Sequence, residues 1–391
     1  MTGPGRAVYL DAAAAVRPAA RVLEAMTHAV AELWASPSGP HPQAGAPAAA
    51  LERAREDVAA LLGAGPDDIV FTCGATEARN LAVAGLLSAN RHLGRRAVLT
   101  SVEHPAVTST VLRLARDGVE HVTVGVDRDG HVDPAALAAA VDERTALVSI
   151  HHGQHEVGAV QDLEALVGAA RAARPEARIH VDAAETAGLL ALDVTALGAD
   201  AVTVGGPAMG APAWSGALWV RPGAGLHPII TGGAQEAGKR AGPEDLPAIV
   251  GLGVAARLAR EAMGARADRR RGLGARLAAG LLAVPGVTLN GPPPESRVPG
   301  NVHVTVARVE GETLAVALGT RGIAVSPGSA CTADAGKASP TLLAMGVPPE
   351  LAHSGLLLGV GDDTAEDEID HAVAVFAEVV ATLRAMSPVG R

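Results

Sequence analysis

The sequence predicts an α/β protein with a large, mostly parallel sheet domain and a smaller α+β domain. Short β-rich runs alternate with Ala- and Leu-rich helical stretches up to about Leu246, which is the pattern of βαβ units and a largely parallel sheet. After that point a long helical run, a Pro-rich turn and a few strands replace the alternation. The length of 391 residues allows two or three structural units at roughly 150 residues each.

The predicted strands of the large sheet are short and rich in Val, Ile and Thr. They cover residues 68–72, 96–100, 120–124, 145–150, 178–182, 201–204 and 217–220. The helices among them cover 45–62, 78–90, 105–117, 133–140 and 163–173. Because a sheet of this kind carries its site at the carboxyl ends of its strands, we expect the functional residues at that edge.

The rest of the chain predicts the smaller domain. We expect helices over 247–282, 311–321 and 366–386, and strands over 287–289 and 301–306. The last helix follows the acidic run DDTAEDEID, which suits a helix start because the first backbone N–H groups there have no partner. We therefore place the large domain at 20–260 and build the small domain from 1–19 and 261–391.

Composition and charge exclude several classes of protein. Hydrophobic residues make up 48% and charged residues 19%, so a packed core is expected rather than disorder. A net charge of −10 argues against a non-specific nucleic-acid binder, which needs a basic face. Two cysteines are too few for a disulfide framework. With no signal-peptide pattern and no long uncharged apolar window, we expect a soluble cytoplasmic protein with no nucleic-acid or membrane partner.

Lysine is scarce in this chain. Only two of the 32 basic residues are lysines, Lys239 and Lys337. Any mechanism that needs a lysine amine therefore has only two candidates.

Segments spread along the chain resemble the cysteine desulfurases, pyridoxal-phosphate (PLP) enzymes of the class V aminotransferase group. They start with VYLD and continue with FTCGATEARN, SVEHPAV, HHGQHEVGAVQD, HVDAAETAG, GALWVRPG, GGAQEAGKRAGPEDLPAIVGLG, GNVHV and SPGSACTAD. The resemblance covers nearly the whole chain. It implies the aspartate-aminotransferase fold (PLP fold type I) and a homodimer with its sites at the subunit interface.

Three matching positions would bind the coenzyme in this family. The resemblance implies that His104 stacks on the PLP ring and that Asp182 keeps the ring nitrogen protonated. It also implies that Thr76 contacts the phosphate at a helix N-terminus, where unpaired N–H groups favour an anion. These residues keep the family pattern.

Cys331 in GSACT matches the nucleophile that becomes a persulfide, on a loop to which Gly328 and Ser329 would give mobility. The alternative is an ordinary thiol, because reactivity depends on exposure and a lowered pKa. For Cys73, at a predicted strand end, we expect a small buried side chain.

Other positions depart from the family pattern, and the lysine that carries PLP as a Schiff base is the main loss. The family lysine falls on Ala208, and the neighbouring histidine and serine of the family, which contact the phosphate, fall on Pro207 and Gly205. The Gly-Thr pair of the family falls on Gly242-Pro243, and the Asn and Gln that contact the ring fall on His155 and Glu185. The Arg that binds the substrate carboxylate falls on Leu357. An imine needs an amine, so covalent PLP is not expected at Ala208. Loss of hydrogen-bond donors also weakens phosphate binding.

The altered pocket admits two interpretations. His104, His155, Asp182 and Glu185 form a plausible divalent-metal set if they converge. The favoured alternative is a hydrogen-bonded polar pocket filled by water. Two buried carboxylates with no cation would raise at least one carboxyl pKa, so a compensating partner is expected beside Asp182 and Glu185. The run of His151, His152 and His155 is weaker evidence, because side chains at a strand end splay apart.

Three functions remain open. The first is a desulfurase-like protein without the usual PLP chemistry: a pseudoenzyme partner, a scaffold, or a persulfide carrier through Cys331, with a sulfur acceptor or a paralogue as partner. The second is a divergent enzyme of specialised metabolism that uses non-covalent PLP, a metal or no cofactor. The third is an active desulfurase that uses Lys239 or Lys337, although neither follows the strand end that faces the ring.

Overall fold

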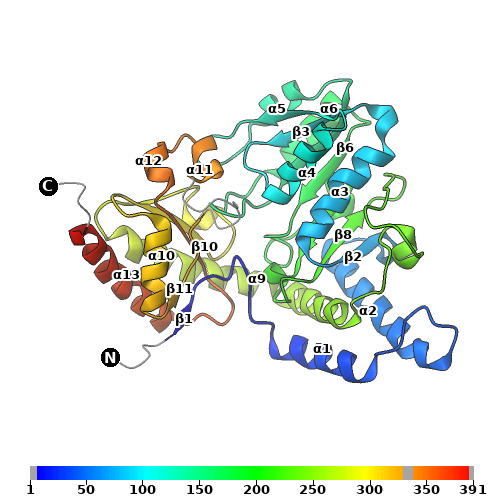
Figure 1. Ribbon diagram of the computed structural model, residues 1–391, viewed down its shortest axis with the longest axis horizontal. Helices are drawn as coiled ribbons and strands as arrows, with labels where there is room; N and C mark the ends of the chain where they lie inside the picture. The colour runs from blue at the N-terminus through cyan, green and yellow to red at the C-terminus, as the bar shows by residue number, and fades with distance from the viewer. Residues whose placement is uncertain (1–6, 329–337, 387–391) are drawn as a thin grey trace.

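The computed structural model describes residues 7–328 and 338–386 (Figure 1). Two residues singled out by the sequence, Cys331 and Lys337, therefore lie outside the described residues.

A seven-stranded sheet forms the centre of the large domain. Its strands are β2 (Ile69–Thr72), β3 (Arg96–Thr100), β4 (Glu120–Val124), β5 (Thr145–His151), β6 (Arg178–Asp182), β7 (Ala201–Gly205) and β8 (Gly216–Val220). They lie in the order β2-β8-β7-β6-β5-β3-β4; β8 runs antiparallel to β2 and β7, and the other neighbouring pairs are parallel. The predicted α/β class is confirmed, and each of the seven predicted strands is present with ends within one residue.

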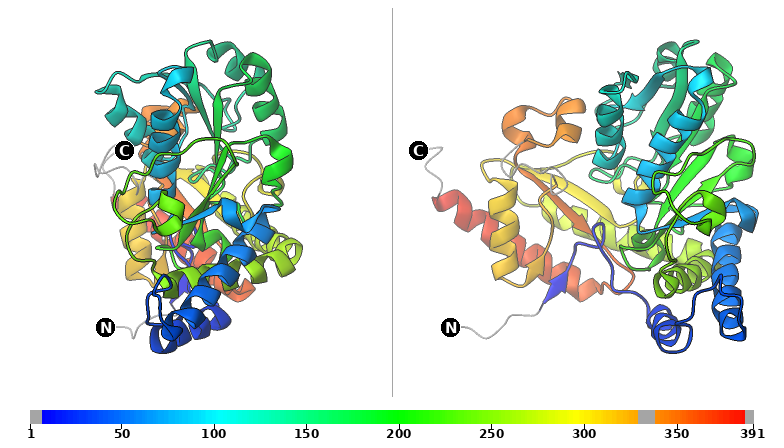
Figure 2. Two further views of the ribbon diagram at one scale, coloured as in Figure 1. Left: turned by 90° about the vertical axis from the view of Figure 1, so that its right-hand side faces the viewer. Right: turned by 45° about the vertical axis from the view of Figure 1, so that its right-hand side comes forward.

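Helices cover both faces of this sheet, and Figure 2 shows the sheet between its two helical layers. The helices of the large domain are α1 (Ala20–Glu32), α2 (Gly45–Leu62), α3 (Ala75–Ala89), α4 (Pro105–Ala115), α5 (Pro134–Ala140), α6 (Leu163–Ala173), α7 (Val194–Leu197) and α8 (Gly206–Met209). One apolar core includes residues of α3 and α4, and the other includes residues of α1, α2 and α6. Burial on both faces explains why β2, β5, β7 and β8 are buried along their whole length.

The small domain has its own sheet and its own core. Strands β9 (Val287–Leu289), β10 (Asn301–Val306) and β12 (Gly355–Gly359) form an antiparallel sheet in the order β12-β10-β9, and β1 (Val8–Tyr9) pairs with β11 (Ile323–Ala324). Its helices are α10 (Gly311–Thr320), α11 (Pro340–Ala344), α12 (Pro349–Ala352) and α13 (Glu366–Met386). Short 3-10 turns lie at η1 (Pro42–Ala44), η2 (Pro66–Asp68), η3 (Arg91–Leu93), η4 (Gln235–Gly238) and η5 (Pro294–Ser296). The sequence analysis missed β12, a short apolar run whose period does not separate strand from helix.

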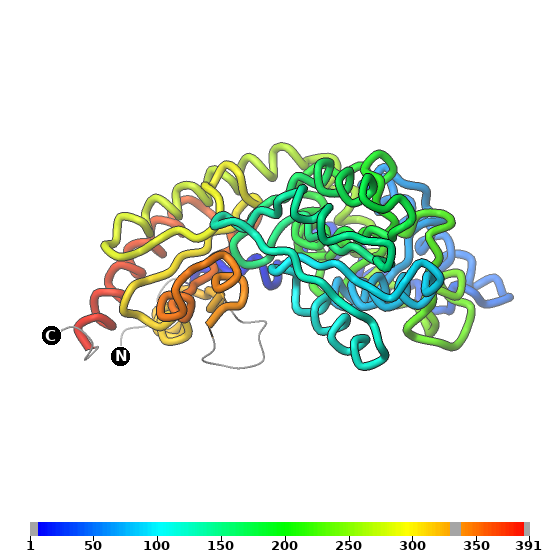
Figure 3. Tube along the Cα trace, turned by 90° about the horizontal axis from the view of Figure 1, so that it is seen from above, coloured from blue at the N-terminus to red at the C-terminus, as the bar shows by residue number. Residues whose placement is uncertain are grey.

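Helix α9 (Leu246–Leu282) joins the two cores. Residues up to Ala259 pack in the core of the large domain, and Leu273, Leu277 and Leu281 pack in that of the small domain. In Figure 3 this helix extends from one domain to the other. None of the helices within residues 7–328 and 338–386 is both long and apolar enough to cross a membrane.

The contact between α2 and α9 yields a prediction about packing. A Cβ atom added at Gly253 would lie 2.5 Å from Ala54 Cα, whereas one at Gly264 on the same helix meets nothing within 4 Å. We expect Gly253→Ala to lower the free energy of unfolding by about 1–3 kcal/mol through overpacking. The matched Gly264→Ala should raise it by up to about 1 kcal/mol, because alanine favours a helix over glycine. Urea unfolding of both variants checks this, and a stabilised Gly253→Ala would contradict the observed packing.

Candidate functional site

The carboxyl edge of the large sheet brings the predicted site residues together. Asp182 is the last residue of β6, and His155 lies in the loop after β5. His104 directly precedes α4, and Ala208 lies in the short helix α8 that follows β7. The parallel arrangement of β5, β6 and β7 is therefore what gathers residues from distant parts of the chain.

Asp182 is buried and paired with an arginine that the sequence analysis did not select. The Nε atom of Arg79, in the second turn of α3, donates to Asp182 Oδ2 at 2.6 Å. The backbone N–H of Ala184 donates to the other carboxylate oxygen at 3.2 Å. The side chains of Arg79 and Asp182 are only 4% and 3% exposed, so the ion pair is shielded from water.

The guanidinium of Arg79 decides the ionisation of Asp182. Burial alone opposes the charged form, but Arg79 outweighs it through charge and hydrogen bonding and lowers the pKa of Asp182 to about 2. Glu185 lies 3.6 Å from another nitrogen of Arg79 and is only half-buried. There burial dominates, and it raises the pKa of Glu185 to about 7 despite the nearby guanidinium.

The expected compensating partner of the two carboxylates is thus Arg79. Arg79 lies 2.6 Å from Asp182 and 3.6 Å from Glu185, where the expectation placed a compensating group. The signal that identifies Arg79 in the sequence is an arginine one turn into a helix that begins at the pocket. It becomes informative only once that helix is known to face the end of β6.

Two histidines lie against each other beside this ion pair. The ring centroids of His104 and His155 are 4.9 Å apart, with the planes tilted by 59°. His104 Nδ1 accepts a hydrogen bond from the backbone N–H of Ala106, which fixes Nδ1 as unprotonated. Burial, followed by the charge of Arg79, lowers the pKa of His104 to about 4. Burial and the neighbouring His104 likewise lower the pKa of His155, so both rings are neutral at pH 7.

A second buried carboxylate adjoins the histidine pair. Glu156 accepts hydrogen bonds from Ser339 Oγ at 2.6 Å and Thr341 Oγ1 at 2.8 Å, and it lies 3.7 Å from His155 Nε2. Burial raises the pKa of Glu156 to about 7, against the effect of the two hydroxyl groups. Glu156 thereby ties the loop after β5 to the N-terminus of α11.

The expected phosphate contacts differ in their surroundings. Thr76 is exposed at the second residue of α3. A Cβ atom added at Gly205 would lie 3.3 Å from both Ala75 Cβ and Ala184 Cβ. The ends of β6 and β7 and the start of α3 therefore pack closely where the family pattern would place a serine.

Ala208 is buried in a small apolar cluster with Leu189 and Val298. The cavity that Ala208 borders, together with His155 and Glu185, has a volume of about 40 Å³. A water molecule takes up about 30 Å³ of liquid, and small-molecule sites usually measure roughly 300–1,000 Å³. This cavity therefore has room for a water molecule, and neither His104 nor Asp182 borders it.

Of the two lysines, the structure describes Lys239, which does not border this cavity. Lys239 follows η4 and borders a different cavity with Arg55 and Asp67. Lys337 lies outside the described residues, as does Cys331. Leu357, at the position of the expected carboxylate-binding arginine, is buried in β12 opposite His303.

The described residues do not fit PLP. Asp182 is already paired with Arg79, the side chain of Ala208 has no amine, and the carbonyl of Ala208 accepts a hydrogen bond from Arg266 Nη2 at 3.1 Å.

The four side chains considered for a metal serve other contacts. In the part of the chain that the structure describes, no three or more His, Cys, Asp or Glu side chains are grouped so that they could hold a metal ion. The run of three histidines splays as expected: His151 Nδ1 lies 3.4 Å from Glu103, and His152 Nδ1 lies 2.8 Å from Thr186 Oγ1.

The expectation for Cys73 was wrong, because its side chain is exposed. It follows the end of β2, where its backbone N–H donates to Glu77 at 2.8 Å and Arg240 Nη2 lies 3.3 Å from Sγ. Burial, with the charge of Glu77, still raises the pKa of this thiol. Cys73 is thus an accessible thiol that is not activated.

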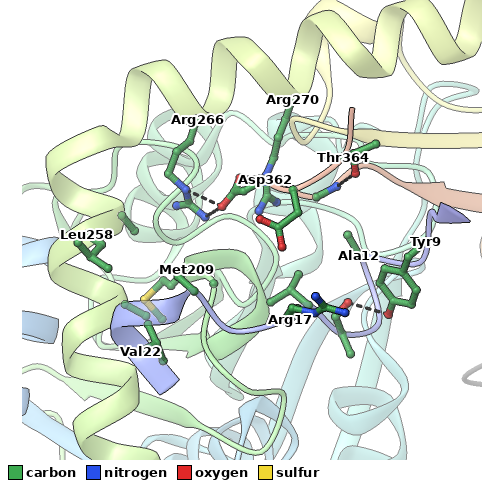
Figure 4. Close-up of a pocket in the computed structure, with 18 of the residues that line it drawn as sticks. Tyr9, Ala12, Arg17, Val22, Met209, Leu258, Arg266, Arg270, Asp362 and Thr364 are labelled. Atoms are coloured by element: carbon green, nitrogen blue, oxygen red, sulfur yellow. Dashed lines mark hydrogen bonds and ion pairs between the residues drawn. The ribbon is translucent and has the colours of Figure 1, made fainter. Parts of the chain in front are cut away.

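A larger cavity of about 990 Å³ lies next to the small one and shares Ala12 and Arg270 with it. It separates the N-terminal segment from α9 (Figure 4). Arg266 and Arg270 both reach toward Asp362 there, with N–O distances of 2.8 and 2.6 Å. Neither His104 nor Asp182 borders this cavity.

Comparisons with known proteins agree with this architecture. The family model described as aminotransferase class V matches residues 8–369. "Cysteine desulfurase IscS 1" of Archaeoglobus fulgidus is 37% identical over 383 residues, covering 98% of this chain and 99% of the relative. "Cysteine desulfurase IscS" of an Anaeromyxobacter species is 41% identical over 385 residues, covering 97% and 94%.

Solved structures give the same result. A structure titled "NIFS-LIKE PROTEIN" matches with a TM-score of 0.90 and 30% identity, covering 96% of this chain and all of that one. "SspA in complex with cysteine" matches with a TM-score of 0.78 and 30% identity, covering 91% and 99%. By sequence over nearly its full length, and by its fold, the chain belongs to the class V aminotransferase family and to the cysteine desulfurases within it.

Proposed function

We propose that this member of the cysteine desulfurase family does not carry out PLP-dependent desulfuration and acts instead as a non-catalytic partner protein. The observation that carries the proposal is the surroundings of Ala208. Its methyl group packs with Leu189 and Val298 beside a cavity of about 40 Å³. A Schiff base needs an amine at the ring, and a methyl group cannot supply one.

The two other functions have less support. A divergent enzyme would need a substrate site at the altered residues, and the cavity bordered by His155, Glu185 and Ala208 holds about a water molecule. The neighbouring cavity of about 990 Å³ is bordered by neither His104 nor Asp182. An active desulfurase would need an amine from elsewhere, and Lys239 borders a separate cavity. The roles that the sequence predicts for Cys331 and Lys337 remain proposals.

As a non-catalytic partner protein, the chain would form a homodimer and would contact a sulfur acceptor or a paralogue. Two of the three tryptophans, Trp34 and Trp214, are 76% and 61% exposed. Large aromatic side chains on a surface favour a protein interface. Light scattering of the purified protein should give twice the mass of the chain, and a monomer would contradict this part of the proposal.

Cys331 is the residue that could receive sulfur from a partner. Its thiolate would attack the outer sulfur of a persulfide on an active desulfurase. A new S–S bond would form at Cys331 as the S–S bond of the donor breaks, and the donor cysteine would leave as a thiolate. This transfer needs neither a coenzyme nor an outside oxidant.

The first test of the proposed function is spectroscopic. Adding PLP to the purified protein should give no imine absorbance band, and adding cysteine should release no sulfide, because Ala208 offers no amine. A cysteine desulfurase relative, assayed in parallel, serves as the positive control. An imine band that disappears in Lys239→Ala or Lys337→Ala would overturn the proposal and restore ordinary desulfuration.

The second test concerns sulfur transfer. An active desulfurase charged with radiolabelled cysteine should label the wild-type chain and Cys73→Ala, but not Cys331→Ala. Cys73 is a suitable control because it is an exposed thiol whose pKa is raised, by burial first and then by Glu77. Equal labelling of all three proteins, or labelling of none, would refute a carrier role for Cys331.

A further inference from the structure

The carboxylate of Asp182 needs a positive charge beside it in order to stay ionised at its buried position. It is buried at the end of β6, and its two oxygens accept from Arg79 and from the N–H of Ala184. An isolated carboxylate in such a place would take up a proton, since desolvation disfavours the charged form. In the family pattern, the protonated nitrogen of the coenzyme ring meets this requirement.

We propose that Arg79 supplies from within the chain the positive charge that Asp182 would otherwise receive from the coenzyme ring, so that the site is complete without a cofactor. The proposal rests on the proposed function, because a coenzyme bound at Asp182 would have to displace Arg79. It adds a role for a residue outside the family pattern: Arg79 is a positioning residue that occupies the site.

The geometry supports a replacement rather than an incidental contact. A guanidinium is a flat cation with N–H donors in its plane, like a protonated pyridine ring. Its Nε–H meets Asp182 Oδ2 at 2.6 Å, and another nitrogen lies 3.6 Å from Glu185. Arg79 is 3% exposed, so it is part of the interior and not a surface side chain that bends inward.

Arg79 provides the positive charge of this ion pair at pH 7, because the histidines around it are neutral. The titratable groups that act on Arg79 or Asp182 are Glu103, His104, His155, His180 and Glu185. Burial lowers the pKa of each of the three histidines, so none of them carries a positive charge at pH 7. The charge on Asp182 is therefore balanced by Arg79.

Replacing Arg79 tests this inference through the pH dependence of stability. In the wild type the pKa of Asp182 is lowered to about 2, so its stabilising contribution is present above the unfolded value of 3.8 and is lost only as the pH falls toward 2. In Arg79→Ala burial acts without the guanidinium, so the folded pKa of Asp182 should rise above its unfolded value. The variant should then lose stability relative to wild type as the pH rises, by up to about tenfold in the unfolding constant per pH unit.

Two further variants separate charge from packing in the urea midpoints measured between pH 5 and 8. Arg79→Ala/Asp182→Asn removes both charges and should abolish most of the pH-dependent loss, since replacing both partners of a buried pair is often near neutral. Arg79→Lys keeps the charge and should retain a profile close to that of the wild type.

A matched arginine elsewhere on the same sheet serves as the control. Arg171 pairs with the buried Asp200, which also lies 3.6 Å from Arg178 and 4.0 Å from Arg221. Arg171→Ala therefore leaves this carboxylate with cations nearby, and we expect no comparable growth of the loss with pH. A pH-dependent loss of the same size in Arg171→Ala would mean that the effect is not particular to Asp182.

Chemical rescue tests the replacement directly. Methylguanidinium at millimolar concentration should bind Arg79→Ala and raise its melting temperature, and it should do neither with wild type or with Arg79→Ala/Asp182→Asn. Pyridoxine, a pyridine ring without phosphate, should compete for the same space. Methylammonium is the control for unspecific salt effects.

Each outcome decides the inference. An Arg79→Ala variant as stable as wild type at pH 8, or one rescued equally by methylammonium, would overturn it. If Arg79→Ala fails to fold, folding of the double variant supports the charge role. Failure of both, while Arg79→Lys folds, would show that Arg79 acts by filling space. Binding of methylguanidinium without pyridoxine would overturn the comparison with the ring. An imine band in the wild type would instead overturn the proposed function.

Discussion

The buried carboxylate of Asp182 sets the conditions for the carboxyl edge of the large sheet. Strand β6 places it among β5, β7 and the start of α3, where water does not hydrate it. Arg79 keeps it ionised at 2.6 Å, and the same guanidinium helps to hold the two neighbouring imidazoles neutral. The polarity of the site thus follows from one ion pair rather than from a set of independent groups.

Small residues let the backbone pack closely next to the ion pair of Arg79 and Asp182. Gly205 and Ala208 allow β7 and α8 to lie against Ala184, Leu189 and neighbouring side chains. In this chain the fold of the family is kept, and these positions are filled by packed side chains.

The two domains meet at this edge through identifiable contacts. Helix α9 contributes to both apolar cores, and its Arg266 reaches the carbonyl of Ala208 at 3.1 Å while pairing with Asp362. Glu156 accepts from Ser339 and Thr341 on the other side of the site. The small domain is therefore in direct contact with α8 and with the loop that carries His155.

The sequence by itself determined the α/β class, the strands of the large sheet and the need for a cation beside Asp182 and Glu185, because periodicity, burial and charge balance are local or additive properties. It also determined that no lysine lies in the first 238 residues. Only the tertiary structure decided which residue supplies the cation, since the pairing of Arg79 with Asp182 joins positions 103 apart. The exposure of Cys73, the strand at Gly355–Gly359 and the small volume at Ala208 were decided there too, because each depends on which side chains distant elements bring into contact.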